Sequence, residues 1–366
     1  MLVFKKSTKK DRTLTTIPIV TKNSGKLEHL LTTLRIITMP LITTTMPSIP
    51  IDFSHITLNL IYDKLTFTLP INIDERLNLI NRINDPEFYQ DYNRKVYNSK
   101  AGRYKNNYQF TIYKGNTIEV SLYPINTKHN FLRIEYNPNK LGRNGRIKLR
   151  KFLIKLLGFD KVKEIYFEAR ITRLDLTLDV YGLKSDYYIQ KPKVQKSAIY
   201  SNADGSISSQ ILGSDNSPCR ITMYDKVVEQ ATKGKKAKSS STNYQRVEVR
   251  LRDLDYTMAE LGLNKDLLDK IKKVDFYHKL FLKDARFSKK FKAYAQEKGL
   301  NAVFKKLRKI DHNEARRYSR YLENYQVLPI CFDNLSFKDT HKAAVGSLLH
   351  CDYSNRLVNF NLDPDP

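Results

Sequence analysis

The sequence predicts an α+β fold in which antiparallel strands form the body of the chain and helices follow. Runs of alternating apolar and polar residues recur between about residues 56 and 252, with short turns between them. From about residue 256 the alternation stops, and apolar residues recur at helical spacing in segments rich in Lys and Arg. Runs of strands followed by runs of helices are typical of α+β proteins.

The charge of the chain points to a polyanionic partner. The 366 residues include 64 Lys and Arg but only 38 Asp and Glu, which gives a net charge of +26. This excess indicates nucleic acid first and an anionic membrane second. A compositional bias towards Lys, Asn and Ile is the alternative, although it explains the Lys content better than the clustered Arg. The 23 Tyr suit base stacking beside phosphate contacts, but Tyr is also common in strands.

Several site classes and locations are not expected. The three Cys lack paired spacing, so neither a disulfide framework nor a zinc site is predicted, and a reducing compartment fits. No apolar run reaches membrane-spanning length, and the N-terminus lacks a secretory signal. The sequence contains no His-x-His pair and no phosphate-binding glycine loop. We therefore expect a cytoplasmic protein that uses neither a membrane nor ATP-driven chemistry.

Residues 1–53 are predicted to be a disordered tail. They are rich in Thr, basic, interrupted by four prolines and without sustained periodicity, apart from a short helix near Leu27–Ile37. Their composition is faintly similar to a transit peptide. A translated stretch upstream of a true start at Met39 or Met46 is an equal alternative.

The first β-rich stretch, about residues 56–136, is predicted to be a meander preceded by one long or two short strands. In order, we predict a strand region at Ile56–Thr68, a helix at Asp74–Arg82 capped by Asp74, an aromatic and basic loop at Glu87–Arg103, strands at Tyr108–Tyr113, Thr117–Tyr123 and Phe131–Tyr136, and a helix at Arg146–Leu157. Gly115-Asn116 supplies a turn between two of these strands.

The second β-rich stretch, about residues 160–252, is predicted to repeat the first as a loose duplication. Its predicted elements are strands at about Ile165–Val180, Ser197–Tyr200, Ser206–Leu212, Arg220–Tyr224 and Tyr244–Arg252. Ile61-Tyr62-Asp63-Lys64 echoes Met223-Tyr224-Asp225-Lys226, which is a weak signal for an internal repeat. Asp225 is also expected to cap a helix that follows it.

The last part of the chain is predicted to be helical and basic. The expected helices are Tyr256–Leu261, Leu267–Val274, Ala285–Lys298, Leu300–Ile310 and Glu314–Tyr325, and little regular structure is predicted after Pro329. We therefore divide the chain into a tail (1–53), a body (54–255), a basic helical region for DNA binding or packing (256–327) and a C-terminal tail (328–366).

The strand near residue 175 carries unusual polar residues. Alternation places its polar side chains on one face, and these are Arg173, Asp175, Thr177 and Asp179. A solvated sheet face is an equal alternative from this stretch alone. The strand Tyr244–Arg252 changes that balance, because Glu248 would face the same way as Asp175 if the two strands were neighbours.

Two carboxylates on one sheet face suit a hard divalent cation such as Mg²⁺ or Mn²⁺, which takes oxygen ligands. Asp175 and Asp179 lie about 13 Å apart along an ideal strand, so at most one of them binds the ion directly. The alternative for Glu248 is a simple charge partner for the Arg residues around it.

Tyr224 ends a predicted strand and is the candidate nucleophile. A tyrosine near carboxylates can attack a phosphodiester when its phenol loses a proton and a metal polarises the phosphoryl oxygens. The resulting phosphotyrosine conserves the bond energy and allows later rejoining. A structural tyrosine is the stronger reading of this residue alone, because Tyr is abundant throughout the chain.

Taken in order, three motifs resemble the replication initiation factor family, the rolling-circle initiators of small bacterial plasmids and some filamentous phages. These motifs are Arg173–Asp179, Met223–Lys226 and Arg246–Arg252. Tyr62–Thr68 looks like the family's first strand, which argues against Tyr62 as a nucleophile. The resemblance covers about residues 56–255, and the long N-terminus and the basic C-terminal helices depart from it.

The resemblance implies a metal-dependent DNA nickase and ligase. Such a protein cuts one strand at a double-stranded origin, stays on the 5′ phosphate through a tyrosine and leaves a 3′ hydroxyl primer. It implies Tyr224 as nucleophile, Asp175 and Glu248 as ligands of Mg²⁺ or Mn²⁺, and Asp179 as a further group near the ion. Arg246 and Lys226 would sit near the scissile phosphate. The implied fold is a duplicated antiparallel sheet, and the implied partners are double- and single-stranded origin DNA, a second copy of the chain, and host helicase and polymerase.

Further basic residues are candidates for DNA contacts. They are Arg173, Arg220, Lys233, Lys235, Lys236, Arg250, Arg316, Arg317 and Arg320. The loop from Lys233 could instead be a solubilising tip, and the three Arg of the last helix could form the solvated face of a packing subdomain.

Two other functions are weighed against the initiator. The first is another tyrosine strand transferase, a relaxase or an integrase, although the Arg/His/Arg set of an integrase is not evident around Tyr318, Tyr321 or Tyr325. The second is a basic DNA- or RNA-binding protein without enzymatic activity, in which Asp175 and Glu248 would be dispensable.

Overall fold

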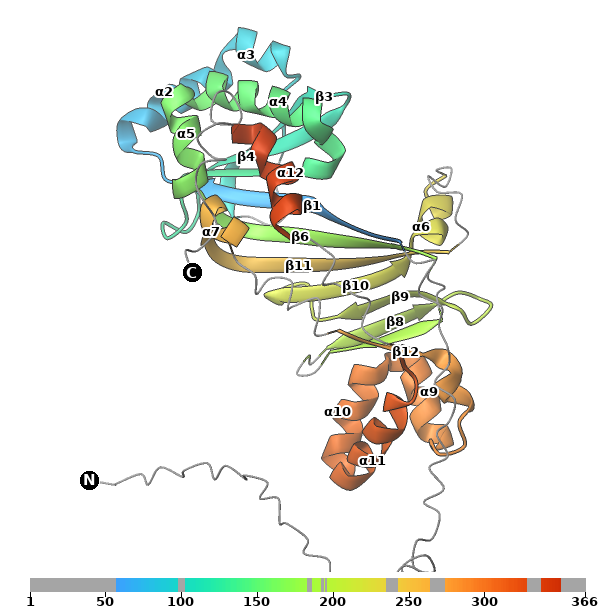
Figure 1. Cartoon of the computed structure of the whole chain (residues 1–366). Coiled ribbons are helices and arrows are strands. Elements are labelled where there is room, and N and C mark those ends of the chain that lie inside the picture. Colours follow the sequence, from blue (N-terminus) through green and yellow to red (C-terminus); the bar gives the residue numbers. More distant parts are fainter. Residues whose placement is uncertain are drawn as a thin grey trace, which may run out of the picture. The chain divides into compact units, whose positions relative to one another are not determined.

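The body of the protein is one large antiparallel sheet. The computed structural model describes residues 57–97, 103–182, 186–191, 194, 196–234, 243–263, 274–327 and 337–349. Ten strands are hydrogen-bonded in the order β2-β3-β4-β5-β1-β6-β11-β10-β9-β8 (Figure 1). Their bounds are β1 Thr57–Leu69, β2 Lys95–Val96, β3 Tyr104–Tyr113, β4 Asn116–Pro124, β5 Leu132–Tyr136, β6 Arg170–Tyr181, β8 Ser197–Ser201, β9 Ile207–Leu212, β10 Cys219–Asp225 and β11 Tyr244–Thr257. The mixed α+β class predicted from the sequence is therefore confirmed.

Strand pairing follows the alternation of the sequence. β1 and β6 pair at the middle of the sheet, and a register shift lies between Tyr62 and Lys64 of β1. Lys114 and Gly115, between β3 and β4, both have positive φ angles, as in a two-residue hairpin turn. This turn lies one residue before the predicted Gly115-Asn116 turn, because Asn116 already belongs to β4. One face of β6 is apolar, with Leu174, Leu176 and Leu178 fully buried.

Helices cover the apolar face of the sheet. They are α2 Ile73–Asn84, α3 Pro86–Asp91, α4 Pro138–Leu157, α5 Phe159–Glu168, α7 Met258–Leu263 and α12 Phe337–Leu349, and they share one hydrophobic core with the strands (Figure 1). A shorter helix, α6 Lys226–Thr232, begins directly after β10, and the side chain of Asp225 accepts hydrogen bonds from its first turn. Covering one face with helices leaves the polar side chains of the other face available for a site.

A second hydrophobic cluster forms around the basic helices. Its buried side chains come from β7 Tyr187–Gln190, β9, β12 Asp275–His278, the 3₁₀ helix η2 Lys279–Lys283, and the helices α9 Lys289–Lys298, α10 Leu300–Ile310 and α11 His312–Glu323. A further strand is β13 Gln326–Val327. β12 lies between β13 and β7 in a three-stranded sheet. The buried side chain of Tyr318 belongs to this core, so it is not placed as a nucleophile.

Several predicted element boundaries were wrong. Residues 165–168 were predicted to begin a strand, but they end α5, because Val162 and Ile165 bury one face of a helix. Asn72 rather than Asp74 caps α2, in a reciprocal pair with Glu75. The predicted loop from Glu87 to Arg103 contains α3 and β2, since Asp85 caps a helix there.

Other elements were missed altogether. β7 and β12 were not predicted, because each is only four residues long. Little regular structure was predicted after Pro329, but α12 packs against β1 and α4. The tail at 1–53, most of the helix predicted at Leu267–Val274 and the last residues from 350 lie outside the described residues. The proposed division into four parts stays a prediction.

Candidate active site

Three neighbouring strands bring the predicted site residues onto one polar face. β11 lies between β6 and β10. In this register Glu248 lies opposite Thr177 on β6 and Thr222 on β10, while Arg246 lies opposite Asp179 and Tyr224. Arg250 lies opposite Asp175 and Arg220. Side chains two residues apart share a face, so all of these groups point to the same side of the sheet.

Tyr224 is hydrogen-bonded to Glu248. The phenolic OH donates to Oε1 of Glu248 at 2.7 Å, and Nζ of Lys226 lies 3.4 Å from the same phenolic oxygen. Burial and the negative charge of Glu248 both raise the pKa of Tyr224. The phenol is therefore protonated at neutral pH, and its proton already points at a carboxylate that can accept it.

Asp179 and Arg246 form a buried two-pronged ion pair. Nε of Arg246 lies 2.6 Å from Oδ1 of Asp179, and Nη2 lies 2.9 Å from Oδ2. Arg246 also donates to the OH of Tyr244 at 3.1 Å. Burial lowers the pKa of Arg246, but the charge of Asp179 outweighs it and raises the pKa overall. This pairing fixes the guanidinium group beside Tyr224.

Asp175 is held by two arginines. Nε and Nη2 of Arg173 donate to its two oxygens at 2.8 and 2.6 Å, and Nε of Arg250 lies 3.5 Å away. The role of Asp175 and Glu248 as ligands of one shared ion stays a prediction. Glu248 lies opposite Thr177, which stands midway between Asp175 and Asp179, so the register gives Glu248 no preference for Asp175.

The donor atoms around Thr177 suit a hard cation, but no assembled metal site is present in the described part of the chain. No group of three or more His, Cys, Asp or Glu there is close enough to hold a metal ion. The buried Oγ1 of Thr177 nevertheless lacks a hydrogen-bond partner. An unsatisfied oxygen beside three carboxylates is the ligand chemistry that Mg²⁺ takes, provided that an aspartate turns away from its arginine.

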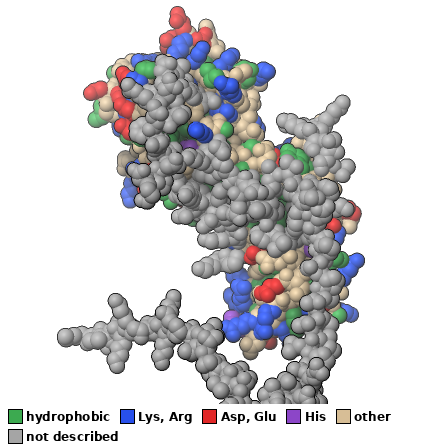
Figure 2. Space-filling view, in the orientation of Figure 1, with side chains coloured by type: hydrophobic (Ala, Val, Ile, Leu, Met, Phe, Trp, Pro, Cys, Tyr) green, Lys and Arg blue, Asp and Glu red, His purple; other side chains and the backbone are tan. Residues whose placement is uncertain are grey.

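The other basic residues predicted to contact DNA differ in their position and in their ion pairs. Arg220 pairs with Asp215, and Lys233 pairs with Glu229. Lys235 and Lys236 lie outside the described residues. Arg316, Arg317 and Arg320 are exposed on α11, opposite its buried face, and Arg317 lies 3.3 Å from Glu314. Figure 2 shows Lys and Arg side chains gathered over α10 and α11.

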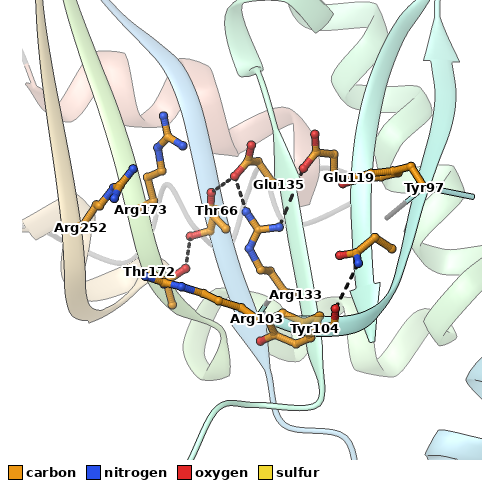
Figure 3. A pocket seen from close by; sticks show the side chains of 11 residues that line it. Thr66, Tyr97, Arg103, Tyr104, Glu119, Arg133, Glu135, Thr172, Arg173 and Arg252 are labelled. Atoms are coloured by element: carbon orange, nitrogen blue, oxygen red, sulfur yellow. Dashed lines mark hydrogen bonds and ion pairs between the residues drawn. The ribbon is translucent and has the colours of Figure 1, made fainter. Parts of the chain in front are cut away.

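Sequence reasoning missed a second polar cluster on the same face of the sheet. It lines a cavity of about 260 Å³ whose walls include Arg103, Arg133, Glu135, Arg173 and Arg252 (Figure 3). Two of these residues carried an unused signal, because Arg133-Ile134-Glu135 has the same spacing and residue types as Arg246-Val247-Glu248. The hydrogen bond from Arg246 to the OH of Tyr244 was also not predicted.

No described helix is long and apolar enough to cross a membrane.

No protein-family model matches the chain. A segment of 121 residues, 33% of the chain, is 32% identical to a replication initiation protein from Staphylococcus aureus. The match covers 35% of that relative, so the chain spans about a third of its length.

Among solved structures, the chain is similar to a rolling-circle replication initiator protein from Geobacillus stearothermophilus. The TM-score is 0.36 at 16% identity, over 64% of this chain and 91% of that one. The sequence relationship with the staphylococcal protein agrees with the family that the three strand motifs resemble. Over that matched segment the chain is therefore similar to a replication initiation protein.

Proposed function

We propose that the protein initiates rolling-circle replication by nicking one strand of its origin DNA through Tyr224. The observation that carries this proposal is the 2.7 Å hydrogen bond from the phenolic OH of Tyr224 to Glu248 on the polar face of the sheet. A nucleophile that donates to a base at this distance is the arrangement required for attack on a phosphodiester.

The reaction follows from this pair. Oη of Tyr224 attacks the phosphorus of the scissile phosphodiester and forms a new O–P bond, while Glu248 takes the phenolic proton. The bond from phosphorus to the 3′ oxygen breaks, and that oxygen leaves with the electron pair and takes a proton from solvent water to give the 3′ hydroxyl primer. The 5′ phosphate stays on Tyr224. Reversal by a 3′ hydroxyl rejoins the strand, which gives the topoisomerase-like ligase activity.

Two cations are placed to stabilise charge as it develops on the phosphoryl oxygens. Lys226 lies 3.4 Å from the attacking oxygen. Arg246 lies opposite Tyr224 in the register, and its pairing with Asp179 keeps it there before substrate arrives. Charges fixed in advance stabilise a transition state without further reorganisation.

A divalent cation, Mg²⁺ or Mn²⁺, would be held by Glu248 with Asp175 or Asp179 and the free oxygen of Thr177. When bound there, it would polarise the scissile phosphate. The residues of the chain then have separate tasks: the carboxylates hold the cation, and Glu248 additionally faces the phenol. Removal of divalent cations by a chelator is expected to stop nicking.

The same proposal extends to the duplicated body, the DNA-contacting residues and the partners of the protein. The duplicated body is supported by the strand order, in which β5-β4-β3-β2 extends from β1 as β11-β10-β9-β8 extends from β6. The exposed Arg316, Arg317 and Arg320 of α11 would contact duplex phosphates, and Arg220, Arg250 and the loop from Lys233 would contact the strand near Tyr224. Origin DNA, a second copy of the chain, and host helicase and polymerase in the cytoplasm are the partners proposed.

The test uses supercoiled DNA that carries the protein's own replicon origin. We expect the protein with Mg²⁺ or Mn²⁺ to convert it to open circles with protein bound covalently to the 5′ end. Tyr224→Phe should abolish both products, because it removes the attacking oxygen but keeps the ring. Gels with and without protease detect the nick and the covalent protein.

The matched control is Tyr244→Phe, which removes a phenol from the same face of the sheet but leaves the proposed nucleophile in place. It should still form the covalent product. Nicking by Tyr224→Phe would overturn the assignment of the nucleophile. Tight origin binding without any nick by the wild-type protein would favour a DNA-binding protein without enzymatic activity.

A further inference from the structure

The N-terminal half of the sheet contains a copy of the candidate active site. In one half Glu135 on β5 lies opposite Thr66 on β1, and in the other Glu248 on β11 lies opposite Thr177 on β6. Two residues away, Arg133 and Arg246 occupy the same position relative to these glutamates. The two strand sets β1-β5-β4 and β6-β11-β10 thus carry the same Thr, Arg and Glu in the same register.

The groups assigned to chemistry are replaced in this copy. In the register, Lys64 stands at the position of Asp175, Thr68 at that of Asp179, and Ser121 at that of Tyr224. Ser121 lies opposite Arg133 as Tyr224 lies opposite Arg246. The copy therefore lacks both the tyrosine and the two aspartates, and it has gained a cation.

Lys64 neutralises the glutamate of the copy. Its Nζ lies 2.5 Å from Oε1 of Glu135, and the hydroxyl of Thr66 donates to Oε2 at 2.9 Å. Burial raises the pKa of Glu135, but the charges of Arg133 and Lys64 outweigh burial and lower it to about 2. A carboxylate whose oxygens are paired with two cations and a hydroxyl binds a metal ion or a proton only weakly.

Beside this copy, positive charge is left without partners. Arg103 and Arg252 form no hydrogen bond or ion pair through their side chains with any residue that the structure describes. Arg173 and Arg252 lie opposite one another on neighbouring strands, and Figure 3 shows both at the edge of the cavity. Burial, and then the charges of Arg173, Arg250 and Arg103, lower the pKa of Arg252. Crowded cations of this kind are stabilised by an anion bound between them.

We propose that this cavity, here called the N-terminal pocket, performs no chemistry and binds one backbone phosphate of the DNA that Tyr224 cleaves. The anchoring side chains are Arg103 and Arg252, and the neighbouring Arg173, which is paired with Asp175, adds positive charge beside them. Guanidinium groups bind phosphate oxygens in pairs, and Arg is favoured over Lys for this geometry. The identity of the DNA as the cleaved molecule rests on the proposed function, whereas phosphate binding by the pocket does not.

The spacing of the two sites suits one DNA molecule. The pocket residue Arg252 and the proposed nucleophile Tyr224 are offset by six residues along the strands, about 20 Å, and lie on the neighbouring strands β11 and β10, about 5 Å apart. Their separation is therefore on the order of 20 Å, which corresponds to about six base pairs at 3.4 Å each. A strand cleaved at Tyr224 and a phosphate in the N-terminal pocket can thus belong to the same short duplex.

The test measures the salt dependence of DNA binding. The probe is a fluorescein-labelled duplex of 30 base pairs with arbitrary sequence, followed by anisotropy across a range of NaCl concentrations without divalent cations. The pocket variant carries Arg103→Gln and Arg252→Gln. Loss of one phosphate contact should lower the slope of log K against log salt by about 0.9 and weaken binding roughly eightfold at 0.1 M salt.

The matched control carries Arg143→Gln and Lys151→Gln, which remove the same charge from exposed positions on α4 across the sheet. It should keep the wild-type slope. A second variant, Arg103→Lys with Arg252→Lys, keeps the charge and should have most of the wild-type slope. If the double Gln variant does not fold, Arg103→Gln alone replaces it, because Arg103 is exposed. Circular dichroism confirms that each variant is folded.

An unchanged slope in the pocket variant would overturn the proposal, as would an equal loss in the α4 control. Tyr224→Phe separates this proposal from the proposed function. That variant should lose the covalent product on origin DNA but keep the wild-type salt slope. If the wild-type protein does not nick its origin, the proposed function fails, and the slope still decides whether the pocket binds phosphate.

Discussion

Glu248 and Glu135 occupy equivalent positions in the two halves of the sheet, each opposite a threonine on the neighbouring strand, but their hydrogen-bond and ion-pair partners differ. Glu248 accepts a hydrogen bond from a tyrosine, whereas Glu135 is neutralised by Lys64 and Arg133. A carboxylate that faces a phenol can accept a proton, and one that is paired with two cations cannot do so readily. At the scale of a residue, the partner rather than the residue type decides the role.

This difference predicts the effect of Glu248→Gln. An amide keeps the shape of the side chain but does not take the phenolic proton, so the rate of nicking should fall by about 10²- to 10⁴-fold. The rate of covalent product formation on origin DNA, measured in a single turnover, tests this. The control is Glu168→Gln at the exposed C-terminal end of α5, which should nick at the wild-type rate. An unchanged rate in Glu248→Gln would rule out Glu248 as the proton acceptor.

At the scale of an element, α12 is held to the sheet core by a buried histidine. The OH of Tyr62 on β1 lies 3.1 Å from Nδ1 of His341, and His341 also bonds the backbone of Met258. A Cβ on Gly262 would lie 2.8 Å from the imidazole, so α7 approaches the ring closely. Burial lowers the pKa of His341 to about 4.

The lowered pKa predicts that the protein loses stability in mild acid. Below pH 6.5 the unfolded chain takes up a proton at His341 that the folded chain does not, so unfolding becomes more favourable until about pH 4. This group alone should lower the free energy of unfolding by about 2 kcal/mol between pH 7 and pH 5. Urea unfolding at the two pH values measures the change.

The control for this prediction is His341→Gln, whose free energy of unfolding is also measured at pH 7 and pH 5. Only the change between the two pH values is compared with that of the wild-type protein, so a lower stability of the variant at pH 7 does not matter. The loss between pH 7 and pH 5 should be smaller in this variant by about 2 kcal/mol. An equal loss in both proteins would assign the pH dependence to other groups.

At the scale of the whole molecule, the two halves of the sheet share one core. β1 and β6 pair at the middle of the sheet, and the hydrophobic core extends without a break across both halves. Leu176 is fully buried in that core and lies opposite Tyr62 on β1 and Val249 on β11. The candidate active site and the N-terminal pocket therefore depend on one packing arrangement.

A cavity at this position should destabilise both halves together. Leu176→Ala is expected to lower the free energy of unfolding by about 2–5 kcal/mol. Far-ultraviolet circular dichroism and tyrosine fluorescence should report one shared unfolding transition in urea. The control Leu77→Ala, at a side chain of α2 that is 63% exposed, should change it by less than about 0.5 kcal/mol. Two separate transitions in the Leu176 variant would show that the halves unfold independently.

The alternating patterns of the sequence determined most of the strands and the faces of their side chains. Strand periodicity alone placed Asp175 and Asp179 on one face, and Glu248 and Arg246 on one face, because side chains alternate at every residue. The helix after Asp225 was also predicted correctly, since its cap is local. The short strands β7 and β12 and the helix α12 were missed, because long-range packing stabilises them more than local preference does.

Tertiary structure alone decided which side chains meet. The sequence predicted that Asp175 and Glu248 share one face, and the register adds that Glu248 lies opposite Thr177 and that Asp175 pairs with Arg173 and Arg250. The sequence also contained Arg133-Ile134-Glu135, but only the order of the strands makes it the counterpart of Arg246-Val247-Glu248. Alternation fixes the face on which a residue lies, whereas strand order and register, which depend on distant parts of the chain, fix its neighbours.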